Sequence, residues 1–316
     1  MTSQTDIASA PQAEYSWNEQ CCPLCIGREA KLLGRRGGNA HRLGLGKASS
    51  IYRCTGCGLV FPNPMPVPMR VSEHYGDAEK YFAEHSFDAK VTECDNVLAS
   101  IEELGIQRGR LLDIGTGRGE MLKAASARGW EAVGLEPSRD FAQTARERSG
   151  AEVIEARLED RPFQTNSFDV VILGAVLEHV FNPVSLLAGI NYVLRVGGML
   201  WLDVPNEAGW FYSLGNLYQR LRGRDWVVNL SPTFPPYHVF GFSPRSLTKL
   251  LGLSGFRLIK LKTYATPAVI ETQESPVPPL MRGLVRGALL LSAKLGSGTY
   301  VDAWAVKNGN GRQQAI

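Results

Sequence analysis

The hydrophobic pattern of the chain changes at residue 110. From Arg110 onward, short apolar runs alternate with longer amphipathic stretches that end near a glycine. The apolar runs contain few polar residues, as strands do in a sheet covered on both faces. Such alternation predicts an α/β domain with a doubly wound parallel sheet, whose ligand binds at the carboxyl ends of the strands. The predicted strands are RLLDIG, EAVGLE, AEVIEA, FDVVILG and GGMLWLDVP, and the predicted helices are GEMLKAASARG, SRDFAQTARERSG and NPVSLLAGINYVLRVGG.

The chain before residue 110 has a different organisation. The proline-rich run PNPMPVP can continue neither a helix nor a central strand, so it predicts an extended exit from an N-terminal module. Apolar residues at helical spacing then predict a helix from about Asp88 to Leu104, packed over the sheet. We therefore expect a tail over 1–18, a small module over 19–66, a helical linker over 67–108, the α/β domain over 109–306 and a second tail over 307–316.

Composition and charge exclude several classes of protein. Hydrophobic residues make up 44% of the chain and charged residues 21%, which is ordinary for a globular protein. A formal charge of +3 on 316 residues is too small to indicate a nucleic-acid partner. The chain contains no apolar run of membrane-spanning length, and its first residues lack the pattern of a signal peptide. We expect a cytoplasmic protein.

Five of the six cysteines lie in the first fifth of the chain. CCPLCIG and YRCTGCGLVF each contain a C-x-x-C pair, made by Cys22 with Cys25 and by Cys54 with Cys57. Two residues between cysteines allow both thiolates to reach one ion from a tight turn, and Gly27 and Gly58 suit such turns. Two pairs predict a closed four-sulfur zinc site that stabilises a segment too short to bury a core of its own.

Other interpretations of the cysteines are two disulfides or a redox-active pair. Two pairs with matched flanks favour zinc over both. Because four protein ligands leave no open position on the ion, this zinc is expected to be structural rather than catalytic. Cys21 is adjacent to a predicted ligand, but Cys22 gives the two-residue spacing. His41 lies between the pairs and is expected at the surface.

A glycine-rich loop follows the first predicted strand of the α/β domain. In LLDIGTGRGEML, Gly115, Gly117 and Gly119 form a G-x-G-x-G pattern between a strand and a helix. Glu136 ends the next strand and can accept hydrogen bonds from both hydroxyls of a ribose. The loop fits a nicotinamide dinucleotide or S-adenosylmethionine. The third glycine is one position early for a dinucleotide, and Asp113 would repel a pyrophosphate but suits a cationic amino-acid group, which favours the methyl donor.

Residues 110 to about 206 resemble the core of the class I S-adenosylmethionine-dependent methyltransferases. LLDIGTGRG resembles their first motif and VGLEPS the segment with their ribose-binding acid, while RPFQTNSFDVVILGAVLEHVFNP and LRVGGMLWLDVPN resemble the stretches through their fourth and fifth strands. With the cysteine pairs, the chain is similar to bacterial zinc-ribbon methyltransferases of small-molecule and glycan pathways. The resemblance implies a Rossmann-like seven-stranded sheet whose last strand is antiparallel, with FRLIKLKTYA and TYVDAWAVKN as its last two strands.

The resemblance also implies a set of cofactor contacts. Asp113, Gly115 and Gly117 would hold the methionine part and Glu136 the ribose, while Arg157 and Leu158 would border the adenine. The family often has an aspartate where this chain has Arg157, so Glu155 or Glu159 is an alternative partner for the adenine amine. The full set implied for the cofactor is Asp113, Gly115, Thr116, Gly117, Glu136, Arg157, Leu158 and Gly174.

Candidate residues for the methyl acceptor follow the fourth and fifth predicted strands. AVLEHVFNP places Glu178 and His179 near the expected cleft, where His179 either removes the acceptor proton or braces the cofactor pocket. The insertion 207–243 is rich in aromatic residues and is expected to build an acceptor pocket or lid, with simple apolar cover as the alternative. Its His238 is a second candidate base. Related quinone-biosynthesis enzymes have an acid, associated with a divalent metal, where this chain has Ala175, so no catalytic metal is predicted.

Two basic segments have less specific interpretations. Arg220, Arg222 and Arg224 either contact an acidic group on the acceptor or form a solvated face. The run 279–296 is apolar with sparse arginine and lysine, so it predicts a helix that packs on the core or on another chain, or that contacts a membrane surface or a lipid-like acceptor.

Together these patterns predict a methyltransferase that acts on a hydroxyl, or less readily a carbon, of a small molecule, sugar or lipid-like intermediate. Two rival interpretations remain at the level of the sequence. One is a dinucleotide-dependent oxidoreductase, against which the glycine spacing and Asp113 count. The other is a zinc-ribbon binding protein whose methyltransferase fold has lost catalysis, against which the glycines and Glu136 count.

Overall fold

A computed structural model describes residues 15–26, 29–37, 46–69, 86–265 and 279–309. The strands are β1 Tyr15–Asn18, β2 Ala30–Arg36, β3 Ser49–Cys54, β4 Val60–Pro62, β5 Met65–Pro68, β6 Arg110–Ile114, β7 Glu131–Leu135, β8 Glu152–Ile154, β9 Phe168–Gly174, β10 Leu194–Pro205, β11 Trp226–Val227, β12 Phe256–Tyr264 and β13 Tyr300–Lys307. The α-helices are α3 Phe87–Glu103, α4 Glu120–Ala127, α5 Arg139–Ser149, α6 Pro183–Val193, α7 Trp210–Leu221, α8 Pro244–Leu253 and α10 Pro279–Lys294; η2 Leu158–Asp160 and η3 Leu177–His179 are 3-10 turns.

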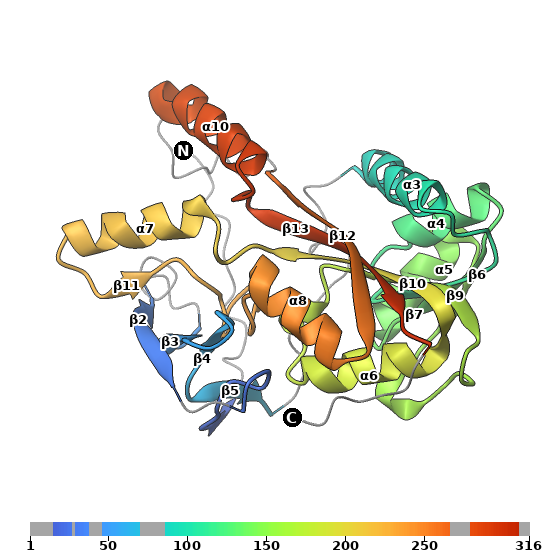
Figure 1. Cartoon of the computed structure of the whole chain (residues 1–316), viewed down its shortest axis with the longest axis horizontal. Helices are drawn as coiled ribbons and strands as arrows, with labels where there is room; N and C mark the ends of the chain where they lie inside the picture. Colours follow the sequence, from blue (N-terminus) through green and yellow to red (C-terminus); the bar gives the residue numbers. More distant parts are fainter. Residues whose placement is uncertain (1–14, 27–28, 38–45, 70–85, 266–278, 310–316) are drawn as a thin grey trace, which may run out of the picture.

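A seven-stranded sheet forms the centre of the molecule, in the order β12-β13-β10-β9-β6-β7-β8 (Figure 1). The strands from β6 to β10 pair in parallel, whereas β13 is antiparallel to both of its neighbours, β10 and β12. The five strands and three helices predicted between residues 110 and 205 are all present, and so is the antiparallel last strand. The predicted fold class is confirmed.

Helices cover both faces of this sheet, because alternate strand residues point in opposite directions. On β6, Leu111 packs in a cluster with α3 and α4, whereas Leu112 packs in a cluster with α6 and α8. The helix predicted from about Asp88 to Leu104 is α3, and its buried residues Cys94, Leu98 and Ile101 lie on the first face as expected. Continuous apolar strands therefore reflect burial on both sides.

The N-terminal module contributes to a second sheet, of four strands in the order β11-β2-β3-β4. Three of these strands belong to the module, but β11 belongs to the insertion after β10 and pairs in parallel with β2. A bridge between Val60 and Gly241 joins the module to the far end of the same insertion. Leu24 and Phe61 of the module lie in one continuous core cluster with Phe240 and Leu247. The module and the insertion therefore form one packed unit with the central sheet.

Four details differ from the sequence expectations. Residues 15–18 form β1, which pairs with β5, so this part of the predicted tail is ordered by backbone hydrogen bonds. The insertion contains a 12-residue helix, α7, which its aromatic composition did not indicate. The exit run includes a short strand, β5, which is compatible with its prolines because its only partner is β1 at a sheet edge. The predicted tail over 307–316 begins at the last residue of β13, and residues 310–316 lie outside the described residues.

Among the residues that the structure describes, no helix has both the length and the apolar character needed to cross a membrane. The helix expected over 279–296 is α10, which spans 16 residues. It follows β12 and projects from the same side of the molecule as α7 (Figure 1).

Candidate functional site

The central strands bring polar residues together at their carboxyl ends. Asp113 on β6 lies beside Gly134 of β7 and Ile172 of β9, and Gly174 at the end of β9 lies beside Asp203 of β10. Glu136 follows β7 directly, and its backbone N–H donates to the carbonyl of Ile154 at the end of β8. Residues far apart in sequence thus share one edge of the sheet, where a doubly wound fold binds its ligand.

The glycine loop is shaped partly by the packing of the protein itself. Gly115, Gly117 and Gly119 all have positive φ values, of 73°, 54° and 89°. A Cβ atom on Gly115 would lie 2.6 Å from the side chain of Val176, and one on Gly119 would lie 2.9 Å from the carbonyl oxygen of Ala145. The loop therefore needs glycine at these two positions whether or not a ligand lies against it.

Two buried polar atoms at this loop have no hydrogen-bond partner among the described residues. They are Oδ2 of Asp113 and Oγ1 of Thr116, and both side chains are almost completely buried. The pKa of Asp113 is raised to about 8, mainly by burial and in addition by repulsion from Glu120 and Glu136. An orphaned acid at this depth is costly unless a donor or a cation reaches it. The loop therefore offers a site for a cationic group.

Glu136 is held in one orientation by the backbone. The N–H group of Ser138 donates to Oε1 of Glu136 at 2.9 Å, and that of Gly117 also donates to this carboxylate. Burial raises the pKa of Glu136, while these two hydrogen bonds lower it. A fixed carboxylate on the strand beside the glycine loop can accept hydrogen bonds from a pair of hydroxyl groups.

Three residues from two distant segments form a cluster beyond β9, in which Glu178 is buried and the two histidines are partly buried. Glu178 and His179 lie in η3, and His238 comes from the insertion after β10. Nε2 of each histidine lies 3.9 Å from Oε1 of Glu178, and the two imidazole rings are 4.9 Å apart between centroids. Oε2 of Glu178 has no hydrogen-bond partner among the described residues. The structure thus brings the two predicted base candidates into one site.

Burial determines the charge of this cluster. It raises the pKa of Glu178 to about 8 and lowers that of His179 to about 4. It also lowers the pKa of His238 to about 3, with the neighbouring His179 as the second cause. At neutral pH both histidines are therefore unprotonated. Nδ1 of His179 lies 3.3 Å from the carbonyl oxygen of Tyr237, which can only accept, so Nδ1 carries the proton and Nε2 has a free lone pair.

Sequence reasoning missed a group of acids and tyrosines beside this cluster. Asp203 accepts a hydrogen bond from the Tyr264 hydroxyl at 3.1 Å, and the Tyr264 ring stacks on Tyr300. Burial raises the pKa of Asp203 to about 7, with its register partner Asp302 as the second cause. The only sign of this group in the sequence was one aspartate, Asp203, in the apolar run GGMLWLDVP. Its partners Tyr264 and Asp302 lie 61 and 99 positions later in the chain, so the sequence pattern did not connect them.

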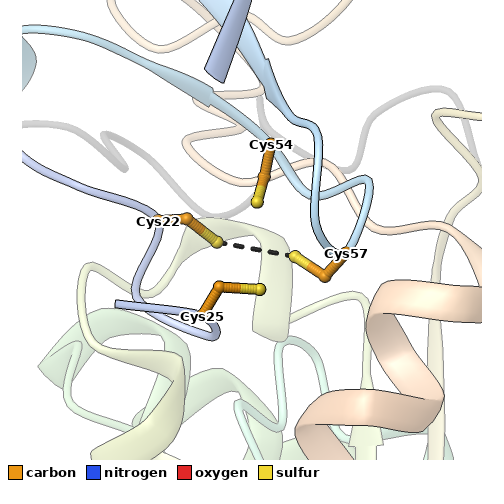
Figure 2. Close-up of side chains that lie close together, drawn as sticks. All are labelled: Cys22, Cys25, Cys54 and Cys57. Carbon is orange, nitrogen blue, oxygen red and sulfur yellow. Dashed lines mark hydrogen bonds between the residues drawn. The ribbon is translucent and has the colours of Figure 1, made fainter. Parts of the chain in front are cut away.

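Four cysteines form a second cluster, in the N-terminal module. The Sγ atoms of Cys22, Cys25, Cys54 and Cys57 all lie within 4.8 Å of one another and point toward a common centre (Figure 2). Cys22 and Cys57 are 3.5 Å apart, close to the roughly 3.8 Å that separates sulfurs around a tetrahedral zinc ion. All four are free thiols, and Cys21 is exposed outside the cluster. The donor set fits one tetrahedral ion.

The two cysteine turns have matching backbones. The residue after each pair has a positive φ value, 49° at Ile26 and 82° at Gly58. The glycine expected for the first turn, Gly27, lies outside the described residues, and the turn uses Ile26 instead. Lys249 of α8 donates to Cys25 Sγ at 3.1 Å, and Arg245 donates to the carbonyl of Gly56. These contacts attach the cluster to the central domain.

Comparisons with known proteins agree with this geometry. The methyltransferase domain family matches residues 112–202. The uncharacterized protein MJ1123 of Methanocaldococcus jannaschii is 30% identical over 154 residues, which cover 48% of this chain and 67% of that protein. The ubiquinone biosynthesis O-methyltransferase of Methylococcus capsulatus is 27% identical over 129 residues, which cover 39% of this chain and 52% of that enzyme, so the matched part spans about half of its length.

A solved structure shows the same fold. It is a SAM dependent methyltransferase from Archaeoglobus fulgidus, with a TM-score of 0.50 and 17% identity, and it covers 72% of this chain and 97% of the other. The chain belongs to the class I S-adenosylmethionine-dependent methyltransferases. The glycine loop alone was also compatible with a dinucleotide-dependent oxidoreductase. The seven-stranded sheet with its antiparallel β13 favours the methyltransferase fold over that alternative.

The structure places the remaining predicted cofactor residues of the methyltransferase less favourably. Arg157 is exposed at the start of η2, where its backbone N–H donates to Asp160. The side chain of Leu158 is buried against α6, where a Cβ on Gly189 would lie 3.0 Å from it. Glu155 and Glu159 are both exposed. Their predicted contacts with adenine therefore remain predictions.

The buried acid Asp113 makes a prediction about pH. Its folded pKa of about 8 lies above its ordinary value of 3.8, so the folded protein binds this proton more tightly than the unfolded chain. The free energy of unfolding therefore falls as the pH rises from about 4 to about 8. Asp113→Asn should raise the free energy of unfolding of the cofactor-free protein at pH 7 by a few kcal/mol at most, and its melting temperature with it, since one pKa unit is about 1.4 kcal/mol.

Thermal unfolding of both proteins between pH 4 and pH 8 checks this prediction. The gap between variant and parent should widen as the pH rises and close near pH 4. Asp140→Asn, at an exposed position in the first turn of α5, is the control and should show no such widening. A gap that stays constant with pH would contradict the shifted ionisation of Asp113.

Proposed function

We propose that this methyltransferase methylates a hydroxyl oxygen of a small molecule, sugar or lipid-like biosynthetic intermediate. The observation that carries the proposal is the pair of neutral histidines around buried Glu178, beside the strand ends where the methyl donor binds. An alcohol must lose its proton as it is methylated, and neutral imidazole is suited to accept it. A carbon acceptor is the less favoured alternative. The matched Methylococcus enzyme is named an O-methyltransferase, which supports oxygen.

His179 is the base that the geometry favours. The Tyr237 carbonyl holds the proton on Nδ1, so the lone pair of Nε2 is free to take the acceptor proton. S-adenosylmethionine supplies an electrophilic methyl group on a sulfonium ion, whose sulfur keeps the bonding electrons. Glu178 lies 3.9 Å from the same Nε2 and stabilises the imidazolium when its carboxyl is ionised. His238, at the same distance from Glu178, is the second candidate.

The two histidines can be tested separately. Incubating metabolite and lipid extracts with the enzyme and methyl-labelled S-adenosylmethionine should label an acceptor whose product carries an O-methyl ether. His179→Ala should lower kcat by about 10²-fold or more, the usual contribution of a general base. His238→Ala should have a smaller effect through packing. Affinity for the methyl donor, measured by calorimetry, should stay unchanged in both variants.

Three outcomes would change this assignment. Full turnover in His179→Ala with a large loss in His238→Ala would move the base to His238. Full turnover in both would show that neither histidine removes the proton. Donor binding without labelling of any extract would favour the rival interpretation, a binding protein that has lost catalysis.

We also propose a residue assignment for the methyl donor. Asp113 and Thr116 would hold the cationic amino-acid group, since their orphaned buried atoms need a donor. Gly115, Gly117 and Gly174 would let the methionine part lie close to the backbone. Glu136 would accept from the ribose hydroxyls, and the segment at Arg157 and Leu158 would border the adenine.

The ribose assignment predicts a loss of donor affinity in Glu136→Ala. Loss of a charged acceptor for two hydroxyls should weaken S-adenosylmethionine binding by at least about tenfold. Glu131→Ala is a matched control, because Glu131 lies on the same strand but at its exposed amino end. Calorimetry of both variants with S-adenosylmethionine measures the effect, and NAD should not bind the parent protein. Equal affinity in Glu136→Ala and the parent would remove Glu136 from the site.

We propose that Cys22, Cys25, Cys54 and Cys57 bind one structural zinc ion. Two observations support this proposal. The four Sγ atoms lie close to one another around a common centre, and three of the four cysteines are buried. Because the module packs in one core with the α/β domain, loss of zinc should destabilise both.

Metal content and stability test the zinc proposal. The purified protein should contain about one zinc per chain, and Cys54→Ser should lose zinc and melt at a lower temperature. Cys94→Ser is the control, since Cys94 is buried in α3 away from the cluster and should keep the metal. Protein purified without added chelator that holds no zinc, or a Cys54→Ser variant that retains it, would contradict the proposal.

A further inference from the structure

Helix α7 presents a continuous apolar stripe to solvent. Its large apolar side chains recur at positions that share one face of a helix, and all are substantially exposed, from 42% at Trp210 to 79% at Leu221. An exposed apolar stripe of this kind on a soluble domain marks an interaction site. The members of the stripe are Trp210, Phe211, Leu214, Leu217, Tyr218 and Leu221.

The opposite face of α7 is fixed to the protein, so the stripe has no freedom to turn inward. Asn216 is buried, donates to Oδ1 of Asn229 at 2.6 Å and accepts from the backbone N–H of Val228 at 2.9 Å. A Cβ on Gly215 would lie 2.8 Å from Val228. Tyr212 faces the same way and is close enough to Glu207 and Glu178 for both to raise the pKa of its hydroxyl, after burial as the main cause. Asn229 in turn donates to Glu207, so the inner face of α7 packs on the insertion that carries His238 of the acceptor cluster.

The charged residues of the two helices are all basic, and one exposed acid, Asp225, follows Arg224. The sequence of α7 contains no acid, and Arg220 and Arg222 are exposed at its carboxyl end, followed by Arg224. The sequence of α10 also contains no acid and includes two arginines and Lys294. Its last turns expose Leu290, Leu291 and the following Leu295. Apolar residues combined with basic residues are typical of helices that lie in the interface of an anionic membrane.

Helices α7 and α10 are joined at one end and project from the same side of the molecule (Figure 1). Asn206, just before α7, donates to the carbonyl of Gly298, just after α10, at 2.7 Å. A Cβ on Gly209, the N-cap of α7, would lie 2.9 Å from the same carbonyl. This close backbone contact fixes the two helices relative to the acceptor side of the sheet.

We propose that α7 and α10 form a surface that docks this methyltransferase on an anionic lipid bilayer. The apolar side chains of α7 would enter the interface, and the arginines would pair with lipid phosphates. A second copy of the chain is a poorer occupant, because neither helix contains an acid that could pair with the arginines of the other copy. Since the inner face of the same helix packs on the insertion that carries His238, docking would place the cleft at the membrane. This consequence rests on the proposed function and selects a lipid-like acceptor.

Vesicle binding tests the docking directly. The full-length protein should co-sediment with vesicles that contain phosphatidylglycerol, and more weakly with pure phosphatidylcholine. Leu217→Glu with Leu221→Glu should weaken binding to phosphatidylglycerol vesicles by at least about tenfold, because two apolar contacts become like charges. Val196→Glu is the matched control. Val196 is 59% exposed and lies near the amino end of β10, whereas α7 follows the carboxyl end of that strand. It should bind vesicles like the parent.

A second variant separates the charge contribution. Arg220→Gln with Arg222→Gln and Arg224→Gln should lower affinity for phosphatidylglycerol vesicles, remove most of its salt dependence and leave the weak binding to phosphatidylcholine unchanged. Affinity for S-adenosylmethionine, measured on the same samples, should be unaltered in every variant. Intact donor binding shows that the fold and the donor site survive.

Three results would overturn the docking proposal. One is a parent protein that does not co-sediment with phosphatidylglycerol vesicles. Another is a Leu217→Glu, Leu221→Glu variant that binds as tightly as the parent. The third is a parent that is dimeric without vesicles and that the same substitutions make monomeric, which would identify the stripe as a self-interface. If docking fails while extracts are still methylated, the proposed function stands without it.

Discussion

The position of the insertion 207–243 depends on backbone hydrogen bonds to two other parts of the chain. The first is the N-terminal module, where β11 pairs with β2, and Val60 and Gly241 exchange two hydrogen bonds. The second is η3, where the carbonyl of Glu178 accepts hydrogen bonds from the N–H groups of Val239 and Phe240. These bonds fix His238 next to His179. The N-terminal module therefore supports the segment that carries His238, and its packing is linked to the geometry of the two histidines.

A buried carboxylate organises the inside of the same insertion. Glu207, fully buried after β10, accepts hydrogen bonds from the side chain of Asn229 and the backbone N–H of Leu230. Burial raises its pKa to about 7, while these bonds and nearby Arg36 lower it. A Cβ on Gly241 would collide with its side chain. Glu207 therefore connects the end of β10 with the insertion and lies near Arg36 of β2. Burial of its carboxylate would be destabilising without these partners.

The sequence allowed the local arrangement of the strand ends to be predicted, and the long-range contacts around the histidines only in part. Asp113, the glycine loop and Glu136 lie within a short stretch of chain, so strand ends and spacing alone bring them together. The cysteine pairs are also local patterns. By contrast, His179 and His238 meet across 59 positions, Asp203 meets Asp302 across the sheet, and β11 joins another segment's sheet. Such contacts are set by tertiary packing, which leaves no periodicity in the sequence. The apolar residues of α7 do show helical spacing in the sequence, but the exposure of that face depends on how the other face packs on Val228 and Asn229.

The two sides of the active cleft therefore differ in how their chemistry is prepared. On the donor side, Asp113 is buried with an orphaned oxygen, a cost that a bound cationic group offsets. On the acceptor side, Glu178 is buried beside two histidines that burial keeps neutral. A positive charge arriving at either acid favours its ionised form. Under the proposed function, binding of the cationic donor and formation of an imidazolium would therefore both be favoured by these buried acids.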